Sequence, residues 1–171
     1  MQAMARWYWC DDSGELIESL GHPPNSRPIA AAVEWIGPEL ITDLHRSFAR
    51  WTEAQLSTGP VLPHRLWIDQ SGLVAIRFAT GAPDRLPEVG AGEELAQWFV
   101  LLSKWMETYV VLARARAVWS TPALAAALPF LSACMLPRSL AQLPPDNWEE
   151  VARGLAAIVL DSALSPNQRA I

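Results

Sequence analysis

A six-residue pattern that occurs twice sets the first constraint on the fold. Trp-x-Asp-x-Ser-Gly runs from Trp9 to Gly14 and again from Trp67 to Gly72. In each copy the Asp side chain can bond to the backbone that follows it, and the Gly can take a positive φ. These are the requirements of a tight turn between two β-strands. The pattern therefore predicts two β-hairpins and gives the repeated residues an architectural role.

The strands of these hairpins are predicted from β-favouring residues on either side of each turn. Residues 6–10 and 16–20 form the first pair, and residues 66–68 and 73–79 form the second. Because side chains alternate along a strand, the aromatic residues of 6–10 are divided between both faces. We therefore expect the sheet to be covered on both sides.

Helices are predicted after each hairpin, beyond connectors that are rich in Pro and Gly. Residues 28–36 are expected to form a short helix, and residues 38–56 a longer one that opens on a proline. Apolar residues at spacings of three and four predict one continuous helix over 93–116. A capping box at Asp146–Glu149 predicts a final helix that ends near Leu164.

These elements predict a single α+β domain over residues 1–171. Two β-hairpins form a small antiparallel sheet packed against a long amphipathic helix, and residues 121–165 form a helical C-terminal part cut by prolines. Each hairpin precedes a helix with a Trp at a matching place. An internal ββα duplication of 5–56 and 64–118 is therefore an alternative to coincidence.

Composition excludes several classes of protein. The chain is 51% apolar and 18% charged, which is typical of a folded domain rather than a disordered one. A formal charge of −5 with scattered basic residues argues against a nucleic-acid partner. Cys10 and Cys134 lie in apolar runs, so we expect free thiols rather than a disulfide.

A cytoplasmic location is expected because residues 1–6 do not begin a secretory signal. The uncharged stretch 117–137 is long enough to span a bilayer, but prolines and alanines favour two short buried helices, so we expect no membrane partner. Only Lys104 among the thirteen basic residues is a lysine, which is typical of a GC-rich bacterial genome.

The sequence offers no motif for catalysis, metal binding or cofactor binding. His22, His45 and His64 lack the spacing of metal ligands, and we expect His45 to be a satisfied or solvent-edge residue. Cys-x-x-Cys, nucleotide-binding glycine loops and the Gly-x-Ser-x-Gly elbow do not occur in the sequence. We therefore predict no catalytic residue, no cofactor and no metal, and a protein that is not an enzyme.

The function predicted from this is a protein-interaction module: an adaptor, assembly factor or chaperone-like subunit that binds a protein partner or a second copy of itself. Surplus apolar and aromatic residues outside the main helical stripe are the predicted partner-binding residues. They are Phe99, Met106, Val110, Trp119 and Trp148. One alternative is a small-molecule binder or enzyme with a Trp-lined pocket between the sheet and the 93–116 helix. A second is an acidic immunity-type inhibitor of a basic toxin.

Overall fold

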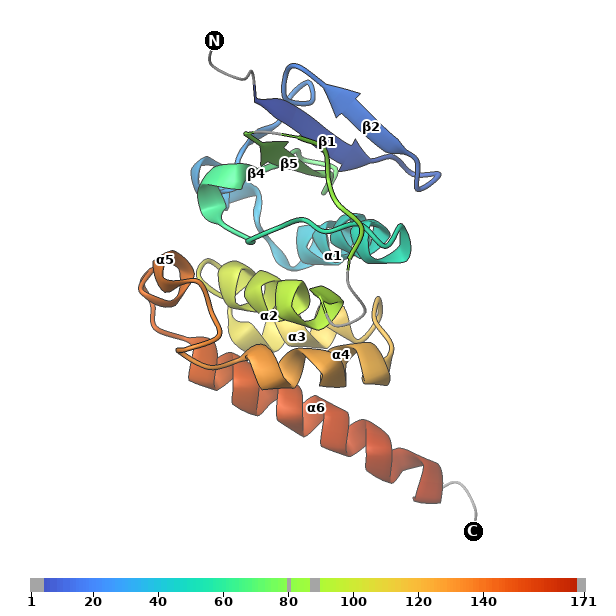
Figure 1. Cartoon of the computed structure of the whole chain (residues 1–171). Coiled ribbons are helices and arrows are strands. Elements are labelled where there is room, and N and C mark those ends of the chain that lie inside the picture. Colours follow the sequence, from blue (N-terminus) through green and yellow to red (C-terminus); the bar gives the residue numbers. More distant parts are fainter. Residues whose placement is uncertain (1–4, 80, 87–89, 169–171) are drawn as a thin grey trace.

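A five-stranded antiparallel sheet forms one end of the molecule (Figure 1). The fold is taken from a computed structural model that describes residues 5–79, 81–86 and 90–168. The strand order is β2-β1-β5-β4-β3, so the two predicted hairpins join through β1 and β5. The strands are β1 Arg6–Cys10, β2 Leu16–Ser19, β3 Arg27–Pro28, β4 Leu66–Ile68 and β5 Val74–Phe78. Both hairpins and the α+β class are confirmed.

The repeated Trp-x-Asp-x-Ser-Gly motif forms the two hairpin turns. Asp11 Oδ1 accepts hydrogen bonds from the backbone N–H of Ser13 and of Glu15, both at 2.9 Å. Asp69 repeats this geometry with the two equivalent N–H groups, at 2.9 and 3.0 Å. The motif glycines have φ values of +83° and +87°. The doublet is therefore a turn signature, as the sequence predicts.

Helix α1, Pro38–Glu53, lies across one face of the sheet and links the two turns to it. Its buried side carries Leu44, Phe48 and Trp51. Arg50 pairs with Asp12 of the first turn at 2.8 Å. On the opposite face of the sheet, the connector after the first hairpin supplies His22, which stacks on a tryptophan of β4 at 4.2 Å. Both faces are covered, as expected.

The short helix predicted over residues 28–36 is not present. Arg27 and Pro28 pair with β4 as the edge strand β3, which draws the start of the segment into the sheet. Two single 3-10 turns follow, Ile29–Ala31 and Val33–Trp35. The prediction was wrong because pairing with β4 outweighs the local helix preference of an alanine-rich stretch.

The helix predicted over residues 93–116 is divided into α2, Gly90–Leu102, and α3, Thr108–Ala115. The backbone tightens after α2 and becomes extended at Glu107, with φ −57° and ψ 131°. Lys104 lies in this break and donates from Nζ to the Pro145 carbonyl at 2.7 Å. The break changes the direction of the helix at α3. Tyr109, which the periodicity places in the apolar stripe, is therefore 70% exposed.

The C-terminal third is helical, as predicted. It contains α4 Thr121–Ala127, α5 Arg138–Ala141 and α6 Trp148–Gln168, with a 3-10 turn at Leu128–Phe130. Figure 1 shows the order of the layers: the sheet, then α1, then α2 with α3, then α4 and finally α6, whose C-terminal end projects beyond the other helices. Among the described residues, no helix has the length and apolarity needed to cross a membrane.

Candidate functional site

The structure divides the five predicted partner-binding residues into two groups. Phe99 and Trp119 are buried, and their rings meet edge to face at 5.5 Å. Burial removes these two from any surface of the folded chain. Met106, Val110 and Trp148 are half-buried, and their role in binding stays a prediction.

His45 is a fully buried residue at the junction of α1, α2 and α3. The Trp98 indole N–H donates to His45 Nδ1 at 3.0 Å, and His45 Nε2 lies 2.8 Å from the Val111 carbonyl oxygen. An indole nitrogen only donates, so Nδ1 must accept and Nε2 must carry the proton. Burial lowers the pKa of His45 to about 4. The residue is a neutral structural link, which agrees with the expectation of a satisfied histidine.

Glu94 is a second buried titratable group, and the sequence analysis did not single it out. Its carboxylate accepts from the Ser57 hydroxyl at 2.5 Å and from the Gly59 N–H at 3.1 Å. Burial raises the pKa of Glu94. Its neighbour Gln97 accepts from the Val61 N–H at 2.8 Å. These bonds attach the loop 57–61 to α2, and the position of Glu94 four residues before Trp98 on the apolar stripe was its signal.

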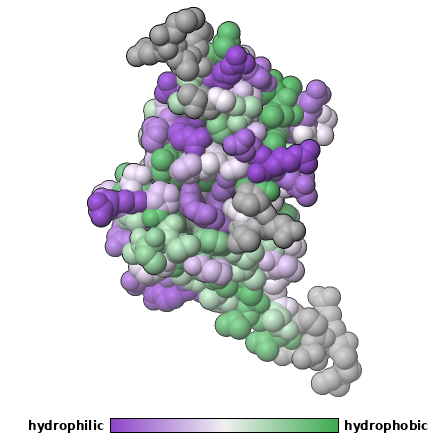
Figure 2. Space-filling view, in the orientation of Figure 1, coloured by the Kyte–Doolittle hydropathy of each residue, from purple (hydrophilic) through white to green (hydrophobic). Residues whose placement is uncertain are grey.

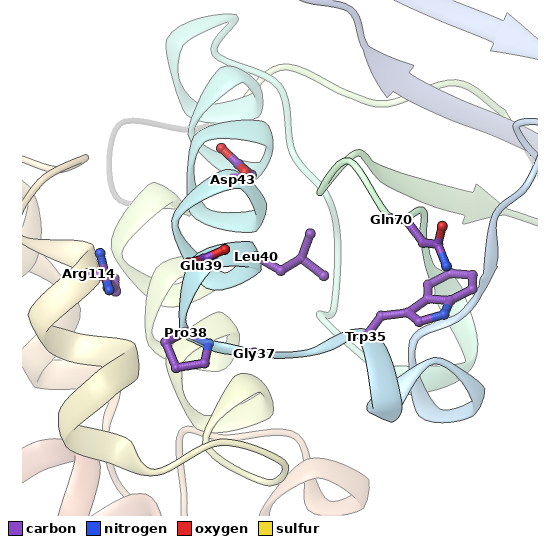
Figure 3. Close-up of a pocket in the computed structure, with 8 residues that line it drawn as sticks. All are labelled: Trp35, Gly37, Pro38, Glu39, Leu40, Asp43, Gln70 and Arg114. Atoms are coloured by element: carbon purple, nitrogen blue, oxygen red, sulfur yellow. The ribbon is translucent and has the colours of Figure 1, made fainter.

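An open hollow of about 660 Å³ lies beside the N-terminus of α1 (Figure 3). Trp35, Leu40 and Gln70 lie on one side of the helix and Arg114 of α3 on the other. The charged side chains that line it are all exposed: Glu39, Asp43 and Arg114. These exposed charges of both signs remain in contact with water.

The layer between the sheet and the 93–116 segment, where a pocket was predicted, contains another helix. Helix α1 occupies that layer (Figure 1), and Phe48 of α1 stacks on Trp98 of α2 at 4.4 Å between ring centroids. Among the residues that the structure describes, no group of three or more His, Cys, Asp or Glu side chains is placed to hold an ion.

The solvent-facing side of α6 is unusual because its C-terminal half carries exposed apolar side chains. Its first turns are charged on that side, with Glu149, Glu150 and Arg153. Beyond Arg153 the exposed residues of the described side chains are Ala157, Leu160, Asp161, Ala163 and Leu164. Leu160 and Leu164 are 63% and 68% exposed. Figure 2 shows this projecting end as a hydrophobic part of the surface.

We call Arg153, Ala157, Leu160, Asp161 and Leu164 the α6 face. The opposite side of the same helix is already packed: Val151 and Leu155 are buried against the domain. A helix that is apolar on both sides is normally a buried one. Complete burial of an exposed leucine side chain contributes about 1.5–3 kcal/mol of favourable free energy. A partner that covers this face would therefore be stabilised by burial of leucines that are exposed in the monomer.

A groove of about 350 Å³ runs beside the α6 face, between α3 and α6. It is lined by Thr108, Tyr109, Leu112, Glu150, Arg153 and Gly154. Gly154 lets the two helices come close, because a Cβ there would lie 2.7 Å from Leu112 Cδ1. The exposed Tyr109 ring and the Leu112 side chain give the groove an apolar lining.

No family model, curated protein or solved structure matches this chain. The candidate site is therefore defined by geometry, and the geometry favours the α6 face with its adjoining groove. The residues predicted to bind a partner lie mainly in the 93–116 segment instead, with Trp119 and Trp148 outside it. The missed signal was charge: after Arg153, the stretch to Gln168 contains only Asp161 as a charged residue.

Proposed function

We propose that this protein is a non-catalytic protein-interaction module, an adaptor, assembly factor or chaperone-like subunit, that binds protein through the α6 face. The observation that carries the proposal is the exposure of Leu160 and Leu164 on a helix whose other side is already packed. The cytoplasmic, bacterial setting expected from the sequence is part of the same proposal.

The attachment of α6 to the domain supports this role. Val151 and Leu155 anchor its first half in the core, and Arg116, which follows α3, pairs with Asp161 at 3.3 Å. A helix held in this way presents its outward residues in a fixed arrangement. Recognition of an apolar helix face by a groove is a common mode of protein binding, and pre-organisation lowers its entropic cost.

The two alternatives have weaker support. A small-molecule site or enzyme would use the hollow beside α1, where the charged residues are exposed and Asp43 is already paired with Arg46 at 3.0 Å. An immunity-type inhibitor would need a concentrated patch of carboxylates. Several carboxylates instead pair with arginines at separate places, as Glu18 does with Arg6 and Glu34 with Arg27.

Replacing both leucines of the α6 face with glutamate is expected to abolish protein association. The Leu160→Glu/Leu164→Glu variant should fold normally, because both side chains are exposed, and it should lose at least about 100-fold in affinity for any protein that covers them. Leu20→Glu is the matched control, since Leu20 is 61% exposed at the end of β2, away from the face.

Association would be measured in two ways with these three proteins. Sedimentation velocity reports self-association of the purified chain, and quantitative affinity purification from the source cells reports other partners. Association that the double variant loses and the control keeps would support the proposal. A monomer whose co-purifying proteins are the same for all three chains would refute it.

A further inference from the structure

We infer that the α6 face binds a second copy of the same chain, with the two α6 helices antiparallel and related by a two-fold axis at Ala157. This inference rests on the proposed function, because it uses the same surface. It adds the identity of the partner and the register of the contact.

The spacing of the α6 face has its centre at Ala157. Arg153 lies four residues before this position and Asp161 four residues after it, and all three are exposed. In an antiparallel pair centred on Ala157, Arg153 of one copy is therefore level with Asp161 of the other. The symmetry produces this opposite-charge contact twice.

The charges select the antiparallel arrangement. Arg153 makes no ion pair with a side chain in the described part of the chain. Asp161 is paired with Arg116 at 3.3 Å, and the two oxygens of an exposed carboxylate can accept from several donors at once. A parallel pair in register would place Arg153 beside Arg153 and Asp161 beside Asp161, and like charges in contact oppose association.

The shape of the surface agrees with this register. Ala157 has a small side chain at the crossing point, which lets the two helices approach closely. Leu164 is level with Glu150 of the other copy, at the groove that Tyr109 and Gly154 help to line. Each copy thus offers a leucine to the groove of the other. The contact is self-complementary and closes as a dimer rather than growing into a filament.

The expected dimer is a weak one. The exposed face from Glu150 to Leu164 is about 21 Å long at 1.5 Å per residue, so with the groove it reaches only the lower end of the size range of specific interfaces. We therefore expect a dissociation constant on the order of 10 µM rather than 10 nM. Measurements of dimerisation therefore need protein concentrations below and above this dissociation constant.

Disulfide trapping tests the two-fold axis. Ala157→Cys, made with the exposed Cys134 replaced by Ser, should form a covalent dimer under mild oxidation, since residue 157 meets itself only at the axis. Ala30→Cys in the same background is the matched control, because Ala30 is also exposed and lies far along the chain, beside the sheet. Dimers from Ala157→Cys and not from Ala30→Cys are expected on non-reducing gels.

Charge reversal tests the register. Arg153→Glu should weaken dimerisation about tenfold, and the double variant Arg153→Glu/Asp161→Arg should recover most of it, because the two contacts are restored with reversed sign. Sedimentation velocity gives both values. Monomers at every concentration, or equal trapping at positions 157 and 30, would overturn this inference.

The outcomes separate this inference from the proposed function. If association is lost in Leu160→Glu/Leu164→Glu but is insensitive to charge reversal and to trapping at 157, the α6 face binds protein in another way, and only the antiparallel dimer fails. If the leucine variant changes no association at all, both fail.

Discussion

Acidification from pH 7 to pH 4 is expected to remove about 3 kcal/mol from the free energy of unfolding through His45 alone. His45 is fully buried and its pKa in the folded protein is lowered to about 4, whereas an unfolded histidine titrates at about 6.5. The unfolded state therefore takes up a proton first. The stability that the neutral imidazole provides is complete above about pH 6.5 and falls as the pH approaches 4.

The contacts of His45 explain why its protonation is so costly. Around the ring lie Trp98, Phe99 and Trp119, with the Trp119 ring centroid at 5.0 Å, and none of them can neutralise a positive charge. A proton on Nδ1 would also face the Trp98 N–H that now donates to that atom. Protonation would thus break the bond between His45 of α1 and Trp98 of α2, whereas the Nε2–H would still donate to the Val111 carbonyl of α3.

Urea denaturation at pH 7, 6, 5 and 4 measures this effect, with His45→Gln as the control. Glutamine does not titrate in this range, and its amide can donate and accept as the imidazole does. Other groups, such as Glu94 with its raised pKa, contribute to both proteins and cancel in the difference. We expect the wild type to approach the variant as the pH falls. A difference that does not change with pH would contradict this account of His45.

Gly72→Ala is expected to destabilise the fold by about 3 kcal/mol, whereas Gly14→Ala should cost about 1 kcal/mol. Both glycines have a positive φ in the same turn motif. At Gly72 a Cβ would lie 2.5 Å from the Asp43 Cβ and 2.9 Å from the Asp43 backbone carbon of α1. At Gly14 it would meet no atom within 4 Å. Gly72 is therefore packed against α1 and Gly14 is not.

The two glycine variants are compared by chemical denaturation under the same conditions. The backbone cost is common to both, so the difference of about 2 kcal/mol reports the close contact between the second turn and α1. The nearby bond from the Val74 N–H to the Ser47 hydroxyl, at 2.8 Å, leaves this turn little freedom to move away. Equal losses in the two variants would show that the turn is not held against the helix.

The hairpins and α1 could be predicted because their signals are local. An Asp that accepts two backbone N–H groups and a Gly at positive φ act within five residues, and the same chemistry gave the same turn at Asp11 and at Asp69. The break between α2 and α3 could not be predicted in this way. It lies where Lys104 meets Pro145, which is 41 residues away, and no Gly or Pro marks it.

The candidate site was missed for a related reason. Apolar spacing shows which residues can be buried, but it does not say which side of a helix has a neighbour. Phe99 lies outside the main apolar stripe of its helix and was therefore predicted to be exposed for binding. It is buried in the core because other elements cover α2 on several sides. Leu160 and Leu164 looked like the ordinary end of a core helix and proved to be exposed because α6 extends past α4.

Amide hydrogen exchange along α6 tests the central claim most directly, because the projecting end of a helix frays unless it is covered. Between 1 and 200 µM protein, a range that brackets the expected dissociation constant of about 10 µM, we predict that exchange in residues 154–164 slows about fivefold, because the monomer fraction falls by about that factor. Exchange in β1 and β5 should stay constant, and Leu160→Glu/Leu164→Glu should remove the effect. Rates in α6 that are the same at both concentrations would contradict a self-binding α6 face.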